Sequence, residues 1–156
     1  MVRLIVAAVT TDRSWTGQEP ADVTAWTLVQ VGHVVGRRFH TAFAEVGLTP
    51  TQFGALLQLD LHPGMTNGQI ARSVLVTPQS TSELMASLEK LGLVHRDIPA
   101  GRGHPVPAQL TPAGRDVLAR CTTAVADVQA SLHLSSDQLT QLNQLLRRVL
   151  DSESPD

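Results

Sequence analysis

A ridge of polar side chains in the segment 77–91 carries the clearest chemistry in this sequence. If the segment is helical, residues three or four apart share a face, and that face holds Gln79, Ser82, Glu83, Ala86 and Lys90, with Ser80 beside it near the N-terminal end. An amide can pair with an adenine edge, a carboxylate can accept a hydrogen bond from cytosine N4, and a hydroxyl can take either role. The N-terminus of such a helix, opened by Thr77, also favours a phosphate oxygen. The residue types therefore fit hydrogen bonding to base edges, and a solvated helix face is the plainer alternative.

Other chemistry has little support among the remaining side chains. Cys121 is the single cysteine and lies on an apolar stripe, so a buried, inert thiol is favoured and neither an internal disulfide nor a Cys-Cys zinc site can form. His33 and His40 share a helix face, but no further metal ligands accompany them. The Ser-x-x-Lys string that begins at Ser87 is a coincidence, because its companion motifs are missing. We therefore expect no enzymatic activity, no cofactor and no metal site.

Capping signals and apolar spacing predict the helices that must position these residues. A long helix is expected over residues 21–46. The further helices are expected to begin at Thr49-Pro50, Thr66, Thr77-Pro78, Thr111-Pro112 and Ser135, three of them in capping boxes closed by Gln52, Gln69 and Gln138. Leu61 and Leu91 are expected to face the core with the other apolar residues of their helices.

A β-hairpin is expected between the fourth and fifth helices. The segments 93–98 and 106–110 look extended, and a loop containing glycine and proline separates them. Pro105 and Pro107 should weaken the second strand, because proline cannot donate to a ladder. A short helix, a tight turn at Leu75-Val76, a second helix and a hairpin form the pattern of a winged helix-turn-helix, which presents one helix to a major groove.

Composition and charge limit the classes of protein that the chain can belong to. Its 156 residues, 42% hydrophobic and 17% charged, fit a globular chain with a substantial core. The formal net charge is −2, but residues 63–116 hold five basic and four acidic side chains, a net +1 on the segment with the base-reading chemistry. The apolar run at residues 4–9 is too short for a membrane span and a weak match to a signal peptide, so a reducing, cytoplasmic setting is expected.

Over residues 49–115 the sequence resembles the MarR family of winged-helix transcription factors, and the flanking helices match in position. The residues that carry the resemblance are Leu48-Thr49, Gln52-Phe53, Leu56-Leu57, Gln69-Ile70-Ala71, the run from Ser80 to Leu84, the run from Leu88 to Arg96, Gly101-Arg102-Gly103 and the run from Leu110 to Arg115. The resemblance implies a homodimer whose first helix and last two helices intertwine, so that two recognition helices read a pseudo-palindromic operator in double-stranded DNA. It also implies a crevice for a small aromatic or anionic effector, for which His33, Arg37 and His40 are the candidate residues.

The resemblance also suggests roles for basic residues around the hairpin. Arg102 occupies the place of a wing-tip arginine that enters the minor groove, where a narrow groove attracts a guanidinium; a plain surface arginine is the alternative. Arg72 and Arg96 would lie near phosphates, and His104 could touch one beside Arg102. The family often has a basic residue where this chain has Glu83, which leaves the operator preference open.

The sequence thus predicts a mainly α fold with a small β-hairpin wing, a winged helix-turn-helix in an intertwined helical dimer. The expected organisation is an N-terminal arm (1–20), a dimerisation helix (21–46), a DNA-binding lobe (47–111), C-terminal dimerisation helices (112–150) and a tail (151–156). The leading prediction is a sequence-specific transcriptional regulator that a small ligand releases from DNA. A repressor is favoured over an activator. The alternative is a winged-helix module that binds another protein and has no affinity for DNA.

Overall fold

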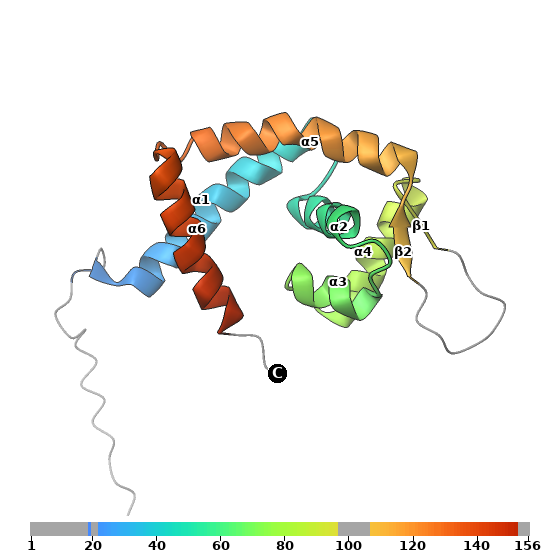
Figure 1. Ribbon diagram of the computed structural model, residues 1–156, viewed down its shortest axis with the longest axis horizontal. Coiled ribbons are helices and arrows are strands. Elements are labelled where there is room, and N and C mark those ends of the chain that lie inside the picture. The colour runs from blue at the N-terminus through green and yellow to red at the C-terminus, as the bar shows by residue number, and fades with distance from the viewer. Residues whose placement is uncertain (1–18, 20–21, 97–106, 153–156) are drawn as a thin grey trace, which may run out of the picture. The chain divides into compact units, whose positions relative to one another are not determined.

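The computed structural model describes residues 19, 22–96 and 107–152. In these ranges the elements follow the order α1 (Thr24–Ala44), α2 (Pro50–Leu61), α3 (Asn67–Ser73), α4 (Pro78–Lys90), β1 (Val94–Arg96), β2 (Ala108–Leu110), α5 (Pro112–Ala130) and α6 (Ser136–Asp151), as Figure 1 shows. The mainly α fold with one small hairpin is therefore confirmed. None of the helices in the described ranges is long and apolar enough to cross a membrane.

The chain divides into two compact units, Met1–Val34 and Val35–Asp156. What the structure describes of the first unit is mainly the beginning of α1, where large apolar side chains are exposed: Trp26, Leu28, Val29, Val31 and Val34. At helical spacing these side chains point to different sides of α1, so this part of the helix has no buried face of its own and calls for a covering surface.

The three predicted capping boxes are present. Thr49, Thr66 and Ser135 each accept a hydrogen bond from the backbone of a glutamine three residues on, and that glutamine's side chain accepts one from the backbone of the capping residue. Such reciprocal bonds satisfy two donors that a helix start otherwise leaves unpaired. The local sequence therefore sets the beginnings of α2, α3 and α6 without help from distant residues.

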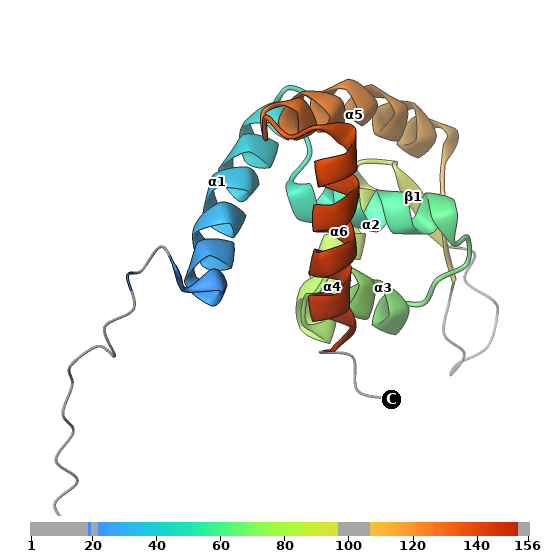
Figure 2. The same ribbon diagram turned by 60° about the vertical axis from the view of Figure 1, so that its left-hand side comes forward.

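The core of the second unit lies where α2, α4, the hairpin and α5 meet. Its largest fully buried side chains include Phe43, Leu56, Ile70, Met85 and Leu88. The Phe43 ring stands 4.6 Å from the Phe53 ring of α2, measured between centroids, and 5.3 Å from the Phe39 ring of α1. Figure 2 shows α5 lying across α2, which it contacts. These contacts fix α2 and, through it, the two helices that follow.

Two leucines expected in the core are exposed instead. Leu61 is 60% exposed and Leu91 is 51% exposed. Leu61 is the last residue of α2, and Leu91 is the residue that caps the C-terminal end of α4. In both helices burial ends before the last apolar residue of the periodic pattern, because at a helix end the chain turns away from the face that the helix buries.

Within the described residues the hairpin consists of three paired positions, with Leu93 and Pro107 outside the strands, and it is anchored to the lobe at its base. The antiparallel register pairs Val94 with Leu110, His95 with Gln109 and Arg96 with Ala108. Ala108 also exchanges backbone hydrogen bonds with the loop between α2 and α3, donating to Met65 and accepting from Gly64 at 3.2 and 3.3 Å. The second strand begins only after Pro107, as expected for a residue without a backbone donor; the predicted strand residues 97, 98 and 106 lie outside the described residues.

Candidate nucleic-acid interface

The helices α3 and α4 pack against each other through a tight turn. The backbone N–H of Val76 donates to the carbonyl of Ala71 at 3.0 Å, and Leu75 takes a positive φ of 56° with its side chain 75% exposed. A left-handed residue reverses the chain in the shortest distance, here at about 1 kcal/mol of strain for a residue with a Cβ. The turn at Leu75-Val76 is therefore confirmed, and it fixes how α4 leaves α3.

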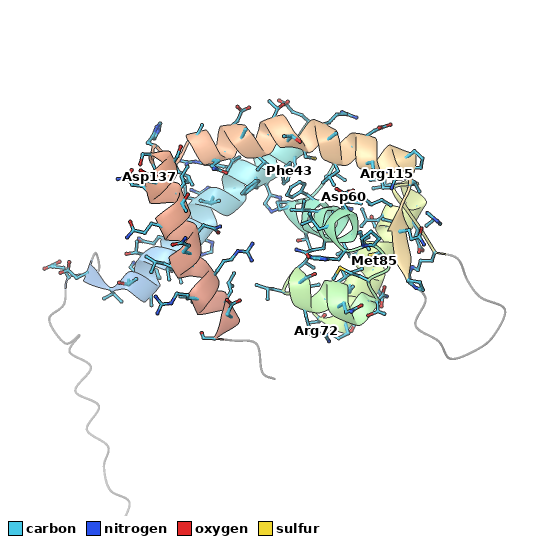
Figure 3. The ribbon with its side chains drawn as sticks, in the orientation of Figure 1. Phe43, Asp60, Arg72, Met85, Arg115 and Asp137 are labelled. Carbon is cyan, nitrogen blue, oxygen red and sulfur yellow. The ribbon has the colours of Figure 1, made fainter. Side chains whose placement is uncertain are left out.

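One face of α4 is buried and the opposite face is free. Thr81, Met85 and Leu88 point into the core, and Figure 3 shows Met85 in the interior of the lobe. The structure places every predicted base-reading residue of this helix on its exposed side: Gln79, Ser80, Ser82, Glu83, Ala86 and Lys90. A helix held by one face presents the other at a fixed angle, as insertion into a major groove requires.

Hydroxyl groups at the start of α4 are already engaged. The Thr77 side chain accepts a hydrogen bond from the Ser80 backbone at 3.1 Å and its hydroxyl donates to the Ser80 hydroxyl at 2.9 Å. The Ser82 hydroxyl donates to the Pro78 carbonyl at 3.2 Å. Within the described residues, the side chains of Gln79, Glu83 and Lys90 have no hydrogen-bond partner, so these three groups are the free ones on the face.

The basic residues named from the sequence differ in their availability. Arg72 is exposed in the last turn of α3, and Figure 3 shows it at the outer side of that helix. Arg96 is half-buried, and its Nε forms an ion pair with Glu89 of α4. Arg96 therefore ties the hairpin to the recognition helix and has only part of its guanidinium left for a phosphate. Arg102 and His104 lie outside the described residues.

A second feature of the Val35–Asp156 unit is a groove of about 670 Å³ between α1, α5 and α6. Apolar side chains dominate its wall: Val35, Phe39, Val128, Leu132, Leu142 and Leu146. Its polar lining consists of amides and hydroxyls only, among them Gln129, Ser136 and Asn143. The groove was not predicted as a cavity, although the apolar stripes that form it are visible in the sequence.

The candidate effector residues on α1 do not line this groove. His33, Arg37 and His40 are exposed, and none of the three belongs to its wall. Their neighbour Arg38, which the sequence did not single out, donates from Nη1 to the carbonyl and the hydroxyl of Ser131 at 3.0 and 2.9 Å. Ser131 caps the C-terminal end of α5, where a cation is favoured by the unpaired carbonyls. Arg38 thus joins α1 to the turn before α6.

The single cysteine, Cys121, lies on the buried side of α5. Cys121 is fully buried, and burial raises the pKa of its thiol, with Arg120 acting weakly in the opposite direction. A raised pKa keeps the thiolate fraction low at neutral pH, so the thiol is a poor nucleophile. No group of three or more His, Cys, Asp or Glu residues that could hold a metal occurs in the described ranges.

Comparison with known proteins agrees with this geometry. Residues 46–103 match the model of a family described as the MarR family. The HTH-type transcriptional repressor Rv2887 of Mycobacterium tuberculosis is 30% identical over 126 residues, which span 80% of this chain and 91% of that protein. The structure of Rv2887 with salicylic acid aligns at a TM-score of 0.67 and 28% identity, covering 86% of this chain and 99% of the other. The transcriptional repressor CouR bound to a 23-mer DNA duplex aligns at 0.76 and 28% identity, covering 87% and 98%.

Proposed function

The chain belongs to the MarR family of transcriptional regulators, and from this premise we propose that it binds a pseudo-palindromic operator as a homodimer and represses transcription until a small ligand releases it. The observation that carries the proposal is the recognition helix α4, buried through Met85 and Leu88 and exposed through its polar face. Two similar proteins have been solved with DNA, Rv2887 and CouR. The proposal includes no catalytic activity and no cofactor, and such a regulator acts where its operator is, in the cytoplasm.

The affinity for DNA would come from a small number of basic side chains in each subunit, which the dimer presents twice. Arg72 is exposed beside α4, and the N-terminus of α4 behind Thr77 can receive a phosphate. The net charge of −2 leaves little general attraction to a polyanion, so a single copy should bind weakly. Two copies on adjacent half-sites add their contacts, and we propose that Arg102 and His104 of each wing add further contacts to the backbone or minor groove.

The homodimer would cover the apolar surfaces that one chain leaves open. Helix α6 has no buried residue, although Leu145, Val149 and Leu150 line one side of it. The groove between α1, α5 and α6 has the same apolar character, and we propose that a second copy of the chain covers it. This division assigns the dimer to α1, α5 and α6, and DNA binding to residues 47–111.

The effector is proposed to be an anionic aromatic compound. Rv2887 has been solved with salicylic acid, and a carboxylate needs a cationic or donor-rich partner. The wall of the groove between α1, α5 and α6 contains amide and hydroxyl donors but no charged side chain, so it offers a carboxylate hydrogen bonds and no opposite charge. His33, Arg37 and His40 on α1 stay the proposed partners for the anion, and salicylate is the probe for the release experiment below.

Selection of bound duplexes from a random library, followed by affinity measurements at several salt concentrations, tests the proposal. We expect one enriched pseudo-palindrome and an affinity that falls steeply with salt, since phosphate contacts release counterions. Arg72→Ala should weaken binding to all duplexes alike and reduce the salt slope by about one for each subunit, which is about two for the dimer. Asp60→Asn, an exposed change on α2, serves as the control that should keep both properties.

Two results would overturn the proposal. If no duplex is enriched at low salt, the protein-binding winged-helix module becomes the better description. If a duplex is enriched and salicylate and related aromatic acids neither shift the melting temperature nor release the DNA, release by an anionic aromatic ligand is wrong.

A further inference from the structure

Two side chains on the exposed face of α4 form no hydrogen bond, although the side chains beside them do. The hydroxyls of Ser80 and Ser82 bond within the first turn of the helix, and Ala86 has no polar group. The Gln79 amide and the Glu83 carboxylate are exposed and have no partner among the described residues. If the N-terminal half of α4 enters a major groove, these two groups are free there to meet base edges, whereas Lys90, also unpaired among the described residues, lies in the last turn of the helix.

The carboxylate has no cation within reach on its own helix. The residues three or four positions away from Glu83 on the exposed side are Gln79, Ser80 and Ala86, and Ser87 already bonds to Gln52. Lys90, the nearest cation along α4, lies two turns further on, in the last turn. Among the residues that the structure describes, Glu83 forms no ion pair, so its negative charge stands without a bound cation there on the surface proposed to face DNA.

Such a charge costs affinity near phosphates unless it accepts a hydrogen bond from a base. The major groove offers two exocyclic amines, cytosine N4 and adenine N6. Adenine places its N7 acceptor beside N6, which repels a carboxylate because a carboxylate has acceptors only, whereas an amide with one donor and one acceptor matches the pair. Cytosine presents its amine without that neighbouring acceptor. The carboxylate of Glu83 thus fits cytosine, and the amide of Gln79 fits adenine.

The spacing of the two groups fixes how far apart the two bases can be. Four residues along a helix rise about 6 Å, and base pairs follow one another every ~3.4 Å. A helix lying along the groove would therefore bring Gln79 and Glu83 to bases about two steps apart.

We propose that Glu83 selects a cytosine, and Gln79 an adenine about two steps away, in each half-site of the operator. The inference rests on the proposed function and deepens it, because it names the bases that the recognition helix reads. The N-terminal half of α4 contains no arginine or lysine, the residues that bind guanine O6 and N7. We therefore expect no guanine to be read by this half of the helix.

Duplex selection with the full-length protein and three variants tests this reading. For the wild type we expect one C·G pair, and one A·T pair about two steps from it, to be enriched at the same places in both half-sites. Glu83→Ala should lower the preference for the C·G pair roughly tenfold and leave the other positions unchanged. Glu83→Gln should move the preference towards adenine, since the amide has a donor beside its acceptor and can pair with both N7 and N6. Asp60→Asn removes a similar exposed charge from α2 and should change nothing in the selected sequence.

A chemical change on the DNA checks the same contact from the other side. Replacing the selected cytosine by 2-pyrimidinone, which lacks the N4 amine, should weaken the wild type and have little effect on Glu83→Ala. If Glu83→Ala and Glu83→Gln select the same bases as the wild type, with only higher affinity for all duplexes, Glu83 acts by general repulsion and the inference is wrong. If the wild type itself selects no sequence, the proposed function fails first.

Discussion

At the scale of single residues, Gly114 shows how closely the lobe is joined to α5. Thr111 caps α5 by accepting a hydrogen bond from the Gly114 backbone, and its own hydroxyl donates to the Gly92 carbonyl at 2.7 Å. Gly92 has a φ of 69°, as expected for the glycine that ends α4. A Cβ built on Gly114 would stand 2.1 Å from the carbonyl oxygen of Leu93. Only a residue without a side chain lets α5 start this close to the end of the recognition helix.

Gly114→Ala should therefore destabilise the protein. Alanine normally favours a helix over glycine by about 1 kcal/mol, but here the obstacle is backbone, and the Leu93 oxygen is held by the Thr111 N–H at 3.1 Å. We expect a loss of about 1–3 kcal/mol in the free energy of unfolding, measured by urea titration. Gly68→Ala is the control, because its Cβ would meet only the end of the Arg72 side chain at 3.9 Å. Equal stability of Gly114→Ala and wild type would refute the close approach.

At the scale of elements, one amide connects the start of α2 to α4. The Gln52 side chain accepts from the Thr49 backbone through Oε1 at 2.8 Å and donates through Nε2 to the Ser87 hydroxyl at 3.1 Å. The other two capping boxes have no such second bond within the described residues. Gln52 thus acts both as a local helix signal and as a tertiary link that helps to orient the recognition helix.

Gln52→Ala should cost more stability than Gln138→Ala. Both remove a capping-box bond, but only the first also removes the bond to Ser87, which is worth roughly 0.5–1.5 kcal/mol. Thermal and urea unfolding of the two variants give the difference, and adding Ser87→Ala to each tests whether it comes from this pair. If Ser87→Ala costs the same with and without Gln52, the hydrogen bond contributes nothing and the prediction is wrong.

At the scale of the whole molecule, α6 and the segment 63–116 differ in surface character, and each suits a different partner. Helix α6 exposes Leu145, Val149 and Leu150 about halfway, which suits a protein partner such as a second copy. The segment 63–116 has a net charge of +1. So small a charge suits DNA binding only if a few basic side chains lie at the phosphates and the dimer presents them twice. Dimerisation and DNA binding are therefore expected to be linked.

Replacing Leu145 and Val149 by glutamate should break the dimer and weaken operator binding. Two carboxylates in an apolar interface would each lose hydration without a partner. Sedimentation velocity should show a monomer where the wild type is a dimer, and duplex affinity should fall at least tenfold. A double variant that stays dimeric would place the interface elsewhere.

The sequence by itself determined the features that depend on neighbouring residues. Capping boxes at Thr49, Thr66 and Ser135, the glycine that ends α4 and the apolar period of each helix are short-range signals, so the order and type of the elements followed from them. The exposed ridge of α4 followed too, because a helix buries one face at a time. Errors appeared at helix ends, where Leu61 and Leu91 turned out exposed.

Only the tertiary structure decided which groups meet across the chain. Pairing of Arg38 with Ser131 and of Gln52 with Ser87 depends on helix packing over sequence separations of 93 and 35 residues, which no local pattern encodes. Arg96 and Glu89 are only seven residues apart, and their pairing depends on how β1 folds back along α4. The same packing forms the uncharged groove beside α6. On α4, the structure shows which hydroxyls already form hydrogen bonds and that the Gln79 amide and the Glu83 carboxylate form none among the described residues. A residue type states which hydrogen bonds a side chain can make, but the packed chain determines which of them are already used.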